Sequence, residues 1–112
     1  MSMTLNDYQK DALVTAMFSG NELLDICHWT LGITGEGGEI AEKVKKIIRD
    51  NNAVISDEVK AEIVKEIGDV LWYLAVLAKQ LGVSFEEIGQ ANIAKLRSRQ
   101  ARDKIKGSGD NR

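Results

Sequence analysis

Proline is absent from this chain of 112 residues, and cysteine occurs only once. Because proline is the strongest helix breaker, its absence favours helical structure. The single cysteine, Cys27, excludes an internal disulfide and suits a reducing compartment, and we expect this small apolar residue to be buried. The longest apolar run, residues 70–78, falls short of the roughly 20 residues that a membrane-spanning helix needs. The first ten residues also lack the apolar segment of a signal peptide, so we predict a cytoplasmic protein.

A strong charge of either sign is also missing, since the formal net charge at pH 7 is -2. This balance gives no reason to expect nucleic acid or an anionic membrane surface as a partner. The apolar content of 44% and the charged content of 29% are ordinary for a soluble globular protein. We predict one helical domain over residues 1–102, with a modest core that would gain from oligomerisation, and a flexible tail over residues 103–112.

Hydrophobic periodicity predicts an all-α, four-helix bundle-like fold without a sheet. The expected helices span about 5–18, 31–50, 57–81 and 85–102, and residues 23–30 form either a short helix or a structured loop. Thr4 is suited to cap the first helix, and Ser84 with Glu87 makes a capping box for the fourth. The third helix carries an apolar seam in which intervals of four and three alternate: Ile63, Ile67, Val70, Leu74, Leu77 and Leu81. Its flanks are also apolar, so we expect a homodimer or homotetramer to cover them.

Two pairs of carboxylates lie on the second and third predicted helices. Glu36 and Glu39 are three residues apart, as are Glu66 and Asp69, so each pair shares one helix face. Like charges beside an apolar seam need protons or cations, and a ligand set made only of oxygen suits Mg²⁺ or Mn²⁺. The alternative is that both pairs are ordinary solvated charges.

Glycines accompany the carboxylates, although each glycine inside a helix costs about 1 kcal/mol relative to alanine. We expect Gly35, Gly37, Gly38 and Gly68 to let two helices approach closely enough for four carboxylates to meet. Lys43 is placed to pair with Glu39, but too few basic side chains are available to neutralise the whole acidic set.

The segment "LGITGEGGEIAEKVKK", followed by "EIVKEIGDVLWYLAVLAKQLGVSFEEIGQANIAKLRSR", resembles the MazG-like nucleotide pyrophosphohydrolases. These are all-α proteins whose signature is E-E-x-x-E followed downstream by E-x-x-D, and the resemblance runs from about Tyr8 to Arg99. It implies a Mg²⁺-dependent hydrolase that converts a nucleoside triphosphate into a monophosphate and pyrophosphate. It also implies a dimer or a dimer of dimers with the site near the interface.

The resemblance assigns roles to individual residues. The residues that match the family's metal ligands are Glu36, Glu39, Glu66 and Asp69, and those that match its phosphate-binding segment are Asn92, Lys95 and Arg99. This chain departs from the signature at Gly35, where the family has its first glutamate, and Glu42 or Glu62 could substitute for the missing carboxylate. We take Glu39 as the group that orients or deprotonates the attacking water.

Aromatic side chains near the acidic motifs are candidates for contacts with the base. We single out Tyr73, Trp29 and His28, with core or interface packing as the alternative interpretation of these side chains. Lys95 and Arg99 share a helix face, and a solvated basic helix end is their alternative.

Three functions remain open from the sequence. The first is hydrolysis of a ribo- or deoxyribonucleoside triphosphate. The second is a related pyrophosphohydrolase acting on a substrate such as phosphoribosyl-ATP, and the third is a catalytically inactive helical interaction module.

Overall fold

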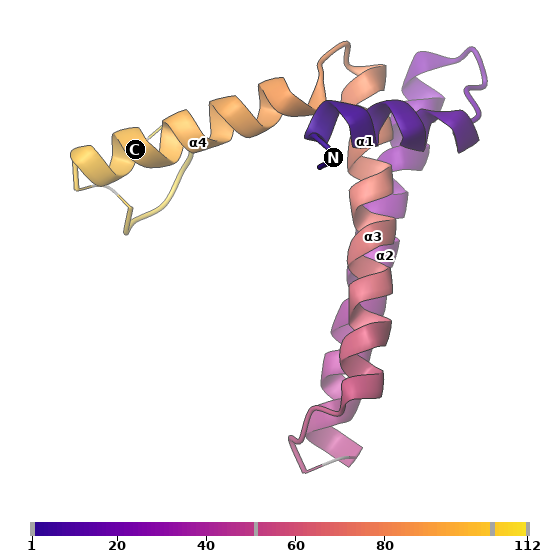
Figure 1. Ribbon diagram of the computed structural model, residues 1–112, viewed down its shortest axis with the longest axis vertical. Helices are drawn as coiled ribbons and strands as arrows, with labels where there is room; N and C mark the ends of the chain where they lie inside the picture. The colour runs from indigo at the N-terminus through magenta and orange to yellow at the C-terminus, as the bar shows by residue number, and fades with distance from the viewer. Residues whose placement is uncertain (1, 51, 104, 112) are drawn as a thin grey trace.

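The computed structural model describes residues 2–50, 52–103 and 105–111, and within them all regular secondary structure is helical (Figure 1). The elements are α1 (Leu5–Ala12), the short 3₁₀ helix η1 (Leu13–Thr15), α2 (Glu22–Asp50), α3 (Asp57–Gln80) and α4 (Phe85–Ala101). This confirms the predicted all-α fold with four main helices. No helix in the described part of the chain is long and apolar enough to cross a membrane.

Side-chain caps determine where three of the helices begin. Thr4 and Asp7 form a reciprocal capping box at α1, in which the Asp7 N–H donates to the Thr4 hydroxyl at 3.0 Å. Ser84 and Glu87 form the same motif at α4, as predicted. Ser56 caps α3 by accepting a hydrogen bond from the backbone N–H of residue 59. These bonds satisfy amides that have no partner inside the helix.

The first two predicted helices have different boundaries in the structure. The first ends at Ala12 rather than near 18, because the chain tightens into η1 and Ala16 adopts an extended conformation. In contrast, residues 23–30 are helical, and α2 runs without interruption for 29 residues through the glycine-rich stretch. The side chain of Asn21 accepts a hydrogen bond from Leu24 N–H near the start of α2. Packing along α3 outweighs the weak helix propensity of the glycines.

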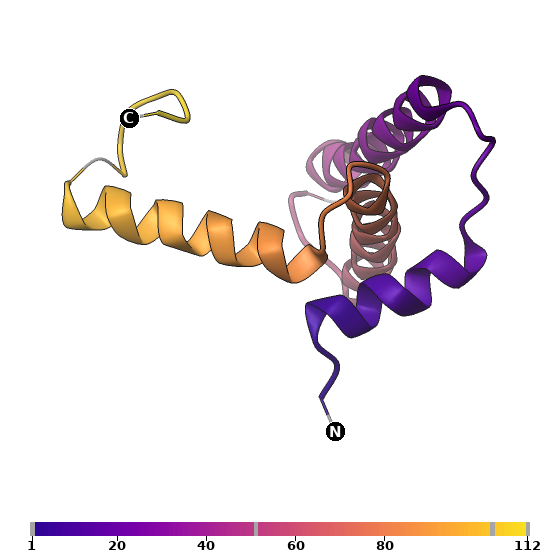
Figure 2. The same cartoon turned by 90° about the horizontal axis from the view of Figure 1, so that it is seen from above.

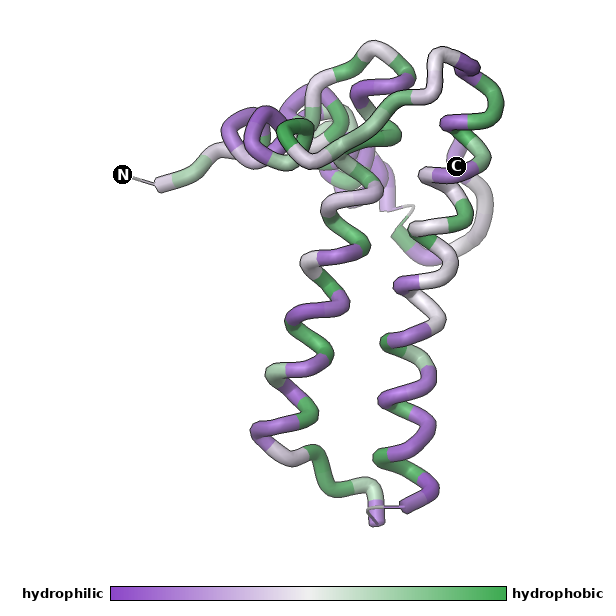
Figure 3. Tube along the Cα trace, turned by 90° about the vertical axis from the view of Figure 1, so that its right-hand side faces the viewer, coloured by the Kyte–Doolittle hydropathy of each residue, from purple (hydrophilic) through white to green (hydrophobic). Residues whose placement is uncertain are grey.

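Helices α2 and α3 form a long antiparallel hairpin, and the other two helices lie near one end of it (Figures 1 and 2). Helix α1 crosses the C-terminal part of α3, and α4 starts at the same junction and then extends away from the hairpin. Hydrophobic and hydrophilic segments alternate along both helices of the hairpin (Figure 3). Apolar residues thus recur along the whole length of both helices.

The core lies at the junction of α1, α3 and α4. Its buried centre consists of Ala12, Ala75, Ala78 and Phe85. Gln9 is buried beside it and connects three segments: its amide donates to the carbonyl oxygens of Ala75 at 3.1 Å and Val83 at 3.3 Å, and its carbonyl accepts from Phe85 N–H at 3.0 Å. The sequence analysis did not identify this role of Gln9.

The predicted apolar seam of α3 is only partly covered. Ile67 and Leu81 are 54% and 59% exposed, because α2 lies against the neighbouring side of α3, which carries Glu62, Tyr73 and Gln80. The exposed apolar residues of the seam and its flank, here called the α3 stripe, are Val64, Ile67, Leu74 and Leu81. The radius of gyration is 17.1 Å, whereas a compact chain of this length has about 13 Å. A single chain thus leaves much of its apolar surface uncovered.

Candidate metal centre

Cross-helix contacts define the register of the α2–α3 hairpin. The Trp29 indole N–H donates to the Gln80 side chain at 3.1 Å, near the junction with α1. Farther along the hairpin, the Lys43 ammonium lies 3.6 Å from the Glu62 carboxylate. Between these two contacts lies the stretch that carries the acidic motifs of both helices. The motifs on α2 and α3 therefore meet midway along the interface between these two helices, which we call the hairpin seam.

Three carboxylates converge at this point. The side chains of Glu36 from α2 and of Glu66 and Asp69 from α3 each offer an oxygen, and these oxygens lie within 4.8 Å of one another. Glu36 and Glu66 are half-buried, and Asp69 is exposed. The spacing of three on α3 places both of its carboxylates on the side that faces Glu36. We call these three residues the carboxylate cluster.

The electrostatics of the carboxylate cluster are unfavourable without a cation. The pKa of the Glu36 carboxyl is raised, first by its hydrogen bond with Glu66, then by burial, and then by repulsion from Glu66, Asp69 and Glu39. One oxygen of Glu66, Oε2, is buried and has no hydrogen-bond partner among the described residues. A buried acceptor without a partner costs free energy. Three converging carboxylates, one of which has a buried oxygen without a partner, fit a hard divalent cation such as Mg²⁺.

Glu39 lies outside the carboxylate cluster but close to it. It is exposed on α2, one turn after Glu36, and its charge contributes to the raised pKa of Glu36. The structure thus brings together three of the four predicted metal ligands and leaves the fourth carboxylate at the edge. Neither candidate substitute for the missing motif glutamate joins them, because Glu42 pairs with Lys45 at 3.0 Å and Glu62 pairs with Lys43.

Aromatic rings lie next to the carboxylate cluster along the hairpin. The Tyr73 ring lies over Gly32, where a Cβ atom would overlap it. His28 is exposed and stacks on Trp29 with ring centroids 4.6 Å apart. Trp29 is only 2% exposed and also contacts the rings of Phe18, Trp72 and Tyr73. Of the three predicted base contacts, His28 and Tyr73 remain accessible, and Trp29 is a buried residue that supports them.

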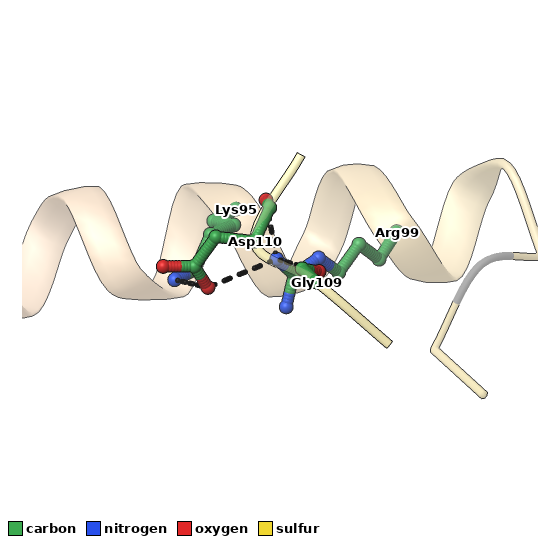
Figure 4. A network of polar contacts seen from close by, with 4 residues as sticks. All are labelled: Lys95, Arg99, Gly109 and Asp110. Carbon is green, nitrogen blue, oxygen red and sulfur yellow. Dashed lines mark hydrogen bonds and ion pairs between the residues drawn. The ribbon is translucent and has the colours of Figure 1, made fainter. Parts of the chain in front are cut away.

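The predicted phosphate-binding residues lie elsewhere in the chain. Lys95 and Arg99 are on α4, which extends away from the hairpin (Figure 1). The Asp110 carboxylate lies 3.1 Å from the Lys95 ammonium, and the Asp110 carbonyl accepts a 2.6 Å bond from Arg99 (Figure 4). Arg99 is only 4% exposed, and these two cations lower the pKa of Asp110. Asn92 is exposed on the same helix and lines a shallow groove with Lys95.

Comparison with known proteins identifies the family. The family model described as the MazG nucleotide pyrophosphohydrolase domain matches residues 28–102. The chain belongs to the MazG family. It is also 45% identical over 114 residues to the Gene 37 protein of Mycobacterium phage L5, an alignment that covers 98% of this chain and all of that protein. No solved structure shows a significant match. The matched MazG region contains the whole carboxylate cluster, His28, Tyr73 and the basic residues of α4.

Three expectations from the sequence are wrong in this MazG chain. Cys27 is exposed rather than buried, because it lies on a side of α2 that α3 does not cover. Lys43 pairs with Glu62 across the hairpin instead of with Glu39 on its own helix. The third expectation concerned the glycines that were to allow close helix approach: a Cβ atom would meet nothing within 4 Å at Gly35, Gly37, Gly38 or Gly68. Close approach occurs at Gly32 instead, where the Tyr73 ring needs the space.

The structure also adds Tyr8 to the surroundings of the MazG carboxylate cluster. This α1 side chain is half-buried, and the pKa of its phenol is raised by burial and by the negative charge of Asp69. Tyr8 lies on the apolar face of α1, four residues before Ala12. That position predicts burial, but the influence of Asp69 on the phenol depends on how α1 packs against α3.

Proposed function

We propose that this MazG chain hydrolyses nucleoside triphosphates, ribo- or deoxyribo-, to monophosphates and pyrophosphate with Mg²⁺ as the cofactor, and that Mn²⁺ can substitute. The observation that carries the proposal is the convergence of Glu36, Glu66 and Asp69, with one buried oxygen of Glu66 left without a partner. A triphosphate is strongly anionic, so an acidic site can bind it only through cations. The cluster is suited to hold a metal ion rather than to bind phosphate directly.

Each residue of the site has a proposed task. Glu36, Glu66 and Asp69 hold Mg²⁺, which when bound polarises phosphate oxygens and makes water more acidic. Glu39 remains exposed beside them and is free to orient a water molecule and accept its proton. The water oxygen forms a bond to phosphorus as the anhydride bond between the α- and β-phosphates breaks, and pyrophosphate leaves with the electron pair. Tyr73 and His28 provide ring surfaces for the base.

The phosphate-binding residues of α4 are proposed to act on the site of a second copy. Lys95 and Arg99 already hold an anionic group, the Asp110 carboxylate, and this supports the proposal that the pair binds a phosphate oxygen. In a single chain, however, α4 leads away from the carboxylate cluster (Figure 1). The exposed α3 stripe supplies an apolar surface for self-association. A homodimer or homotetramer would bring one chain's α4 to the other chain's cluster.

The deciding experiment measures pyrophosphate release from a panel of ribo- and deoxyribonucleoside triphosphates with Mg²⁺. The Glu66→Gln, Asp69→Asn double variant removes two ligands and should abolish turnover. Glu39→Gln should lower kcat by about 10²–10⁴-fold, the usual contribution of a general base. Glu58→Gln is the matched control for the double variant, because it changes an exposed glutamate on α3 outside the cluster.

The variants also separate the alternatives. A native protein that turns over no nucleotide, and whose stability Mg²⁺ does not raise relative to the folded double variant, would contradict the proposal and favour the interaction module. Turnover of phosphoribosyl-ATP alone would place the chain with the related pyrophosphohydrolases.

A further inference from the structure

A small pocket lies between α2 and α3 on the far side of the carboxylate cluster from the aromatic rings. It has a volume of about 220 Å³ and is lined by Lys43, Lys46, Ile47, Val59 and Glu62. Two of its five residues are lysines, although the neighbouring site is acidic. None of the roles assigned so far uses this pocket.

The pocket lies close enough to the carboxylate cluster for one bound substrate molecule to reach both. Lys43 follows Glu39 by four residues on α2, and Glu62 precedes Glu66 by four on α3. Residues four apart are neighbours on a helix, so Glu62 lies about one turn, or about 5 Å, from Glu66 of the cluster. Lys43 lies about one turn from Glu39 and about two turns from Glu36. On the other side, Gly32 and the Tyr73 ring lie about one turn from Glu36 and Asp69.

The hairpin seam therefore presents three kinds of chemistry in a fixed order. Accessible rings at Tyr73 and His28 come first, the carboxylates that suit a divalent cation come next, and the lysines come last. A nucleoside triphosphate has the same order, from the base through the phosphates that a cation bridges to the terminal phosphate. Reversing the substrate would place its most anionic end against the rings.

The Lys43–Glu62 pair has the properties of a contact that a phosphate can replace. The two charged groups are 3.6 Å apart, which is long for a charge-assisted hydrogen bond. The Lys43 side chain is 26% exposed and the Glu62 side chain is 57% exposed. A lysine on the inner side of the hairpin seam thus keeps its charge near the acidic site while its partner remains free to turn into water.

Building on the proposed function, we infer that Lys43, with Lys46 beside it, binds the terminal phosphates of the substrate, which leave as pyrophosphate. Glu62 occupies Lys43 when no substrate is present and competes with the phosphates. The base then lies at the Tyr73 end of the hairpin seam. Because only a triphosphate reaches from the carboxylate cluster to Lys43, this lysine also favours triphosphates over diphosphates.

The test compares KM and kcat for a nucleoside triphosphate and its diphosphate in four proteins: native, Lys43→Gln, Glu62→Gln and Lys45→Gln. Lys43→Gln should raise KM for the triphosphate about ten-fold or more, the loss expected for a charge-assisted hydrogen bond, with little effect on the diphosphate. Glu62→Gln should lower KM for the triphosphate, because it frees Lys43. Lys45→Gln removes an exposed lysine that pairs with Glu42 on α2 and should leave KM unchanged.

KM changes of opposite sign in Lys43→Gln and Glu62→Gln would exclude a purely structural role for the ion pair. If the ion pair only holds the hairpin together, Lys43→Gln and Glu62→Gln both break it. The two variants should then change KM in the same direction as each other, and likewise the unfolding temperature. That outcome would overturn the inference, as would equal KM values for Lys43→Gln and Lys45→Gln.

A binding measurement keeps this inference separate from the proposed function. Pyrophosphate with Mg²⁺ should raise the unfolding temperature of the native protein more than that of Lys43→Gln, and Glu62→Gln should show the largest rise. A native protein without turnover would contradict the proposed function, and the order of these three shifts would still decide the role of Lys43. Equal shifts of the unfolding temperature in all three proteins would contradict the proposed role of Lys43.

Discussion

At the scale of single residues, two helical glycines only three positions apart have opposite surroundings. A Cβ atom at Gly32 would overlap the Tyr73 ring, whereas a Cβ atom at Gly35 would meet nothing within 4 Å. The sequence analysis singled out Gly35 for close helix approach and did not consider Gly32. What separates them is which side of α2 faces α3.

We therefore expect Gly32→Ala and Gly35→Ala to change stability in opposite directions. Gly32→Ala should lower the free energy of unfolding by about 1–3 kcal/mol, because Tyr73 must move out of an overpacked contact. Gly35→Ala should raise it by up to about 1 kcal/mol through better helix propensity. Urea unfolding of both variants measures the difference, and a stabilising Gly32→Ala would show that Tyr73 does not lie over this glycine.

The raised pKa of Glu36 gives stability a definite dependence on pH and metal. Below the ordinary pKa of 4.5, the carboxyl is protonated in both the folded and the unfolded states and has no effect. As the pH rises through the higher folded pKa, the unfolded chain loses the proton more readily, so the folded state becomes relatively less stable. In EDTA, the native protein should therefore lose stability relative to Glu36→Gln between about pH 4.5 and neutrality.

Mg²⁺ should reverse this difference, because the cation favours the ionised carboxylates of the native protein. Thermal unfolding of both proteins across this pH range, with EDTA or Mg²⁺, checks the expectation. Parallel pH curves in EDTA would mean that folding does not raise the pKa of Glu36.

At the scale of the helices, one buried side chain holds three of them in place. Gln9 on α1 bonds to the carbonyl of Ala75 on α3, to the loop at Val83 and to the first amide of α4 at Phe85. Its position beside Tyr8 on the inner face of α1 predicts contact with the core. The sequence pattern does not reveal which backbone groups the amide meets, because its partners are 66 to 76 residues away.

Gln9→Ala should lower the free energy of unfolding by about 1–3 kcal/mol, because the Phe85 N–H would remain buried without an acceptor. The exposed neighbour Lys10→Ala is the control and should change stability by no more than about 0.5 kcal/mol. Chemical denaturation followed by circular dichroism measures both. Equal effects of the two substitutions would mean that the Gln9 bonds do not hold α1 in place.

At the scale of the whole molecule, the chain is open rather than closed into a bundle. Its radius of gyration of 17.1 Å and the exposed α3 stripe both indicate surfaces suited to a second copy. The acidic and basic parts of the proposed site also lie on different arms of the chain (Figure 1). Both observations have the same explanation if two chains share each site.

Complementation tests this arrangement directly. Glu66→Gln and Arg99→Ala should each be inactive alone, and mixing them after dissociation should restore part of the activity, because some mixed dimers contain one site with both intact halves. The same preparations should have the mass of a dimer or tetramer by light scattering. A native mass of one chain at micromolar concentration, or no recovery on mixing, would contradict shared sites.

The sequence by itself determined the all-α fold, the Thr4 cap, the Ser84–Glu87 capping box, the MazG family and the identity of the acidic motifs. These features depend on neighbours within a few residues, on helical periodicity and on motif order, all of which can be read along the chain. Only the tertiary structure decided that Glu36, Glu66 and Asp69 meet while Glu39 stays at the edge, that Gly32 admits Tyr73, and that Lys43 faces Glu62. The physical reason is that the rotation and register of α2 on α3 depend on side-chain packing across the hairpin seam, which no spacing within one helix specifies.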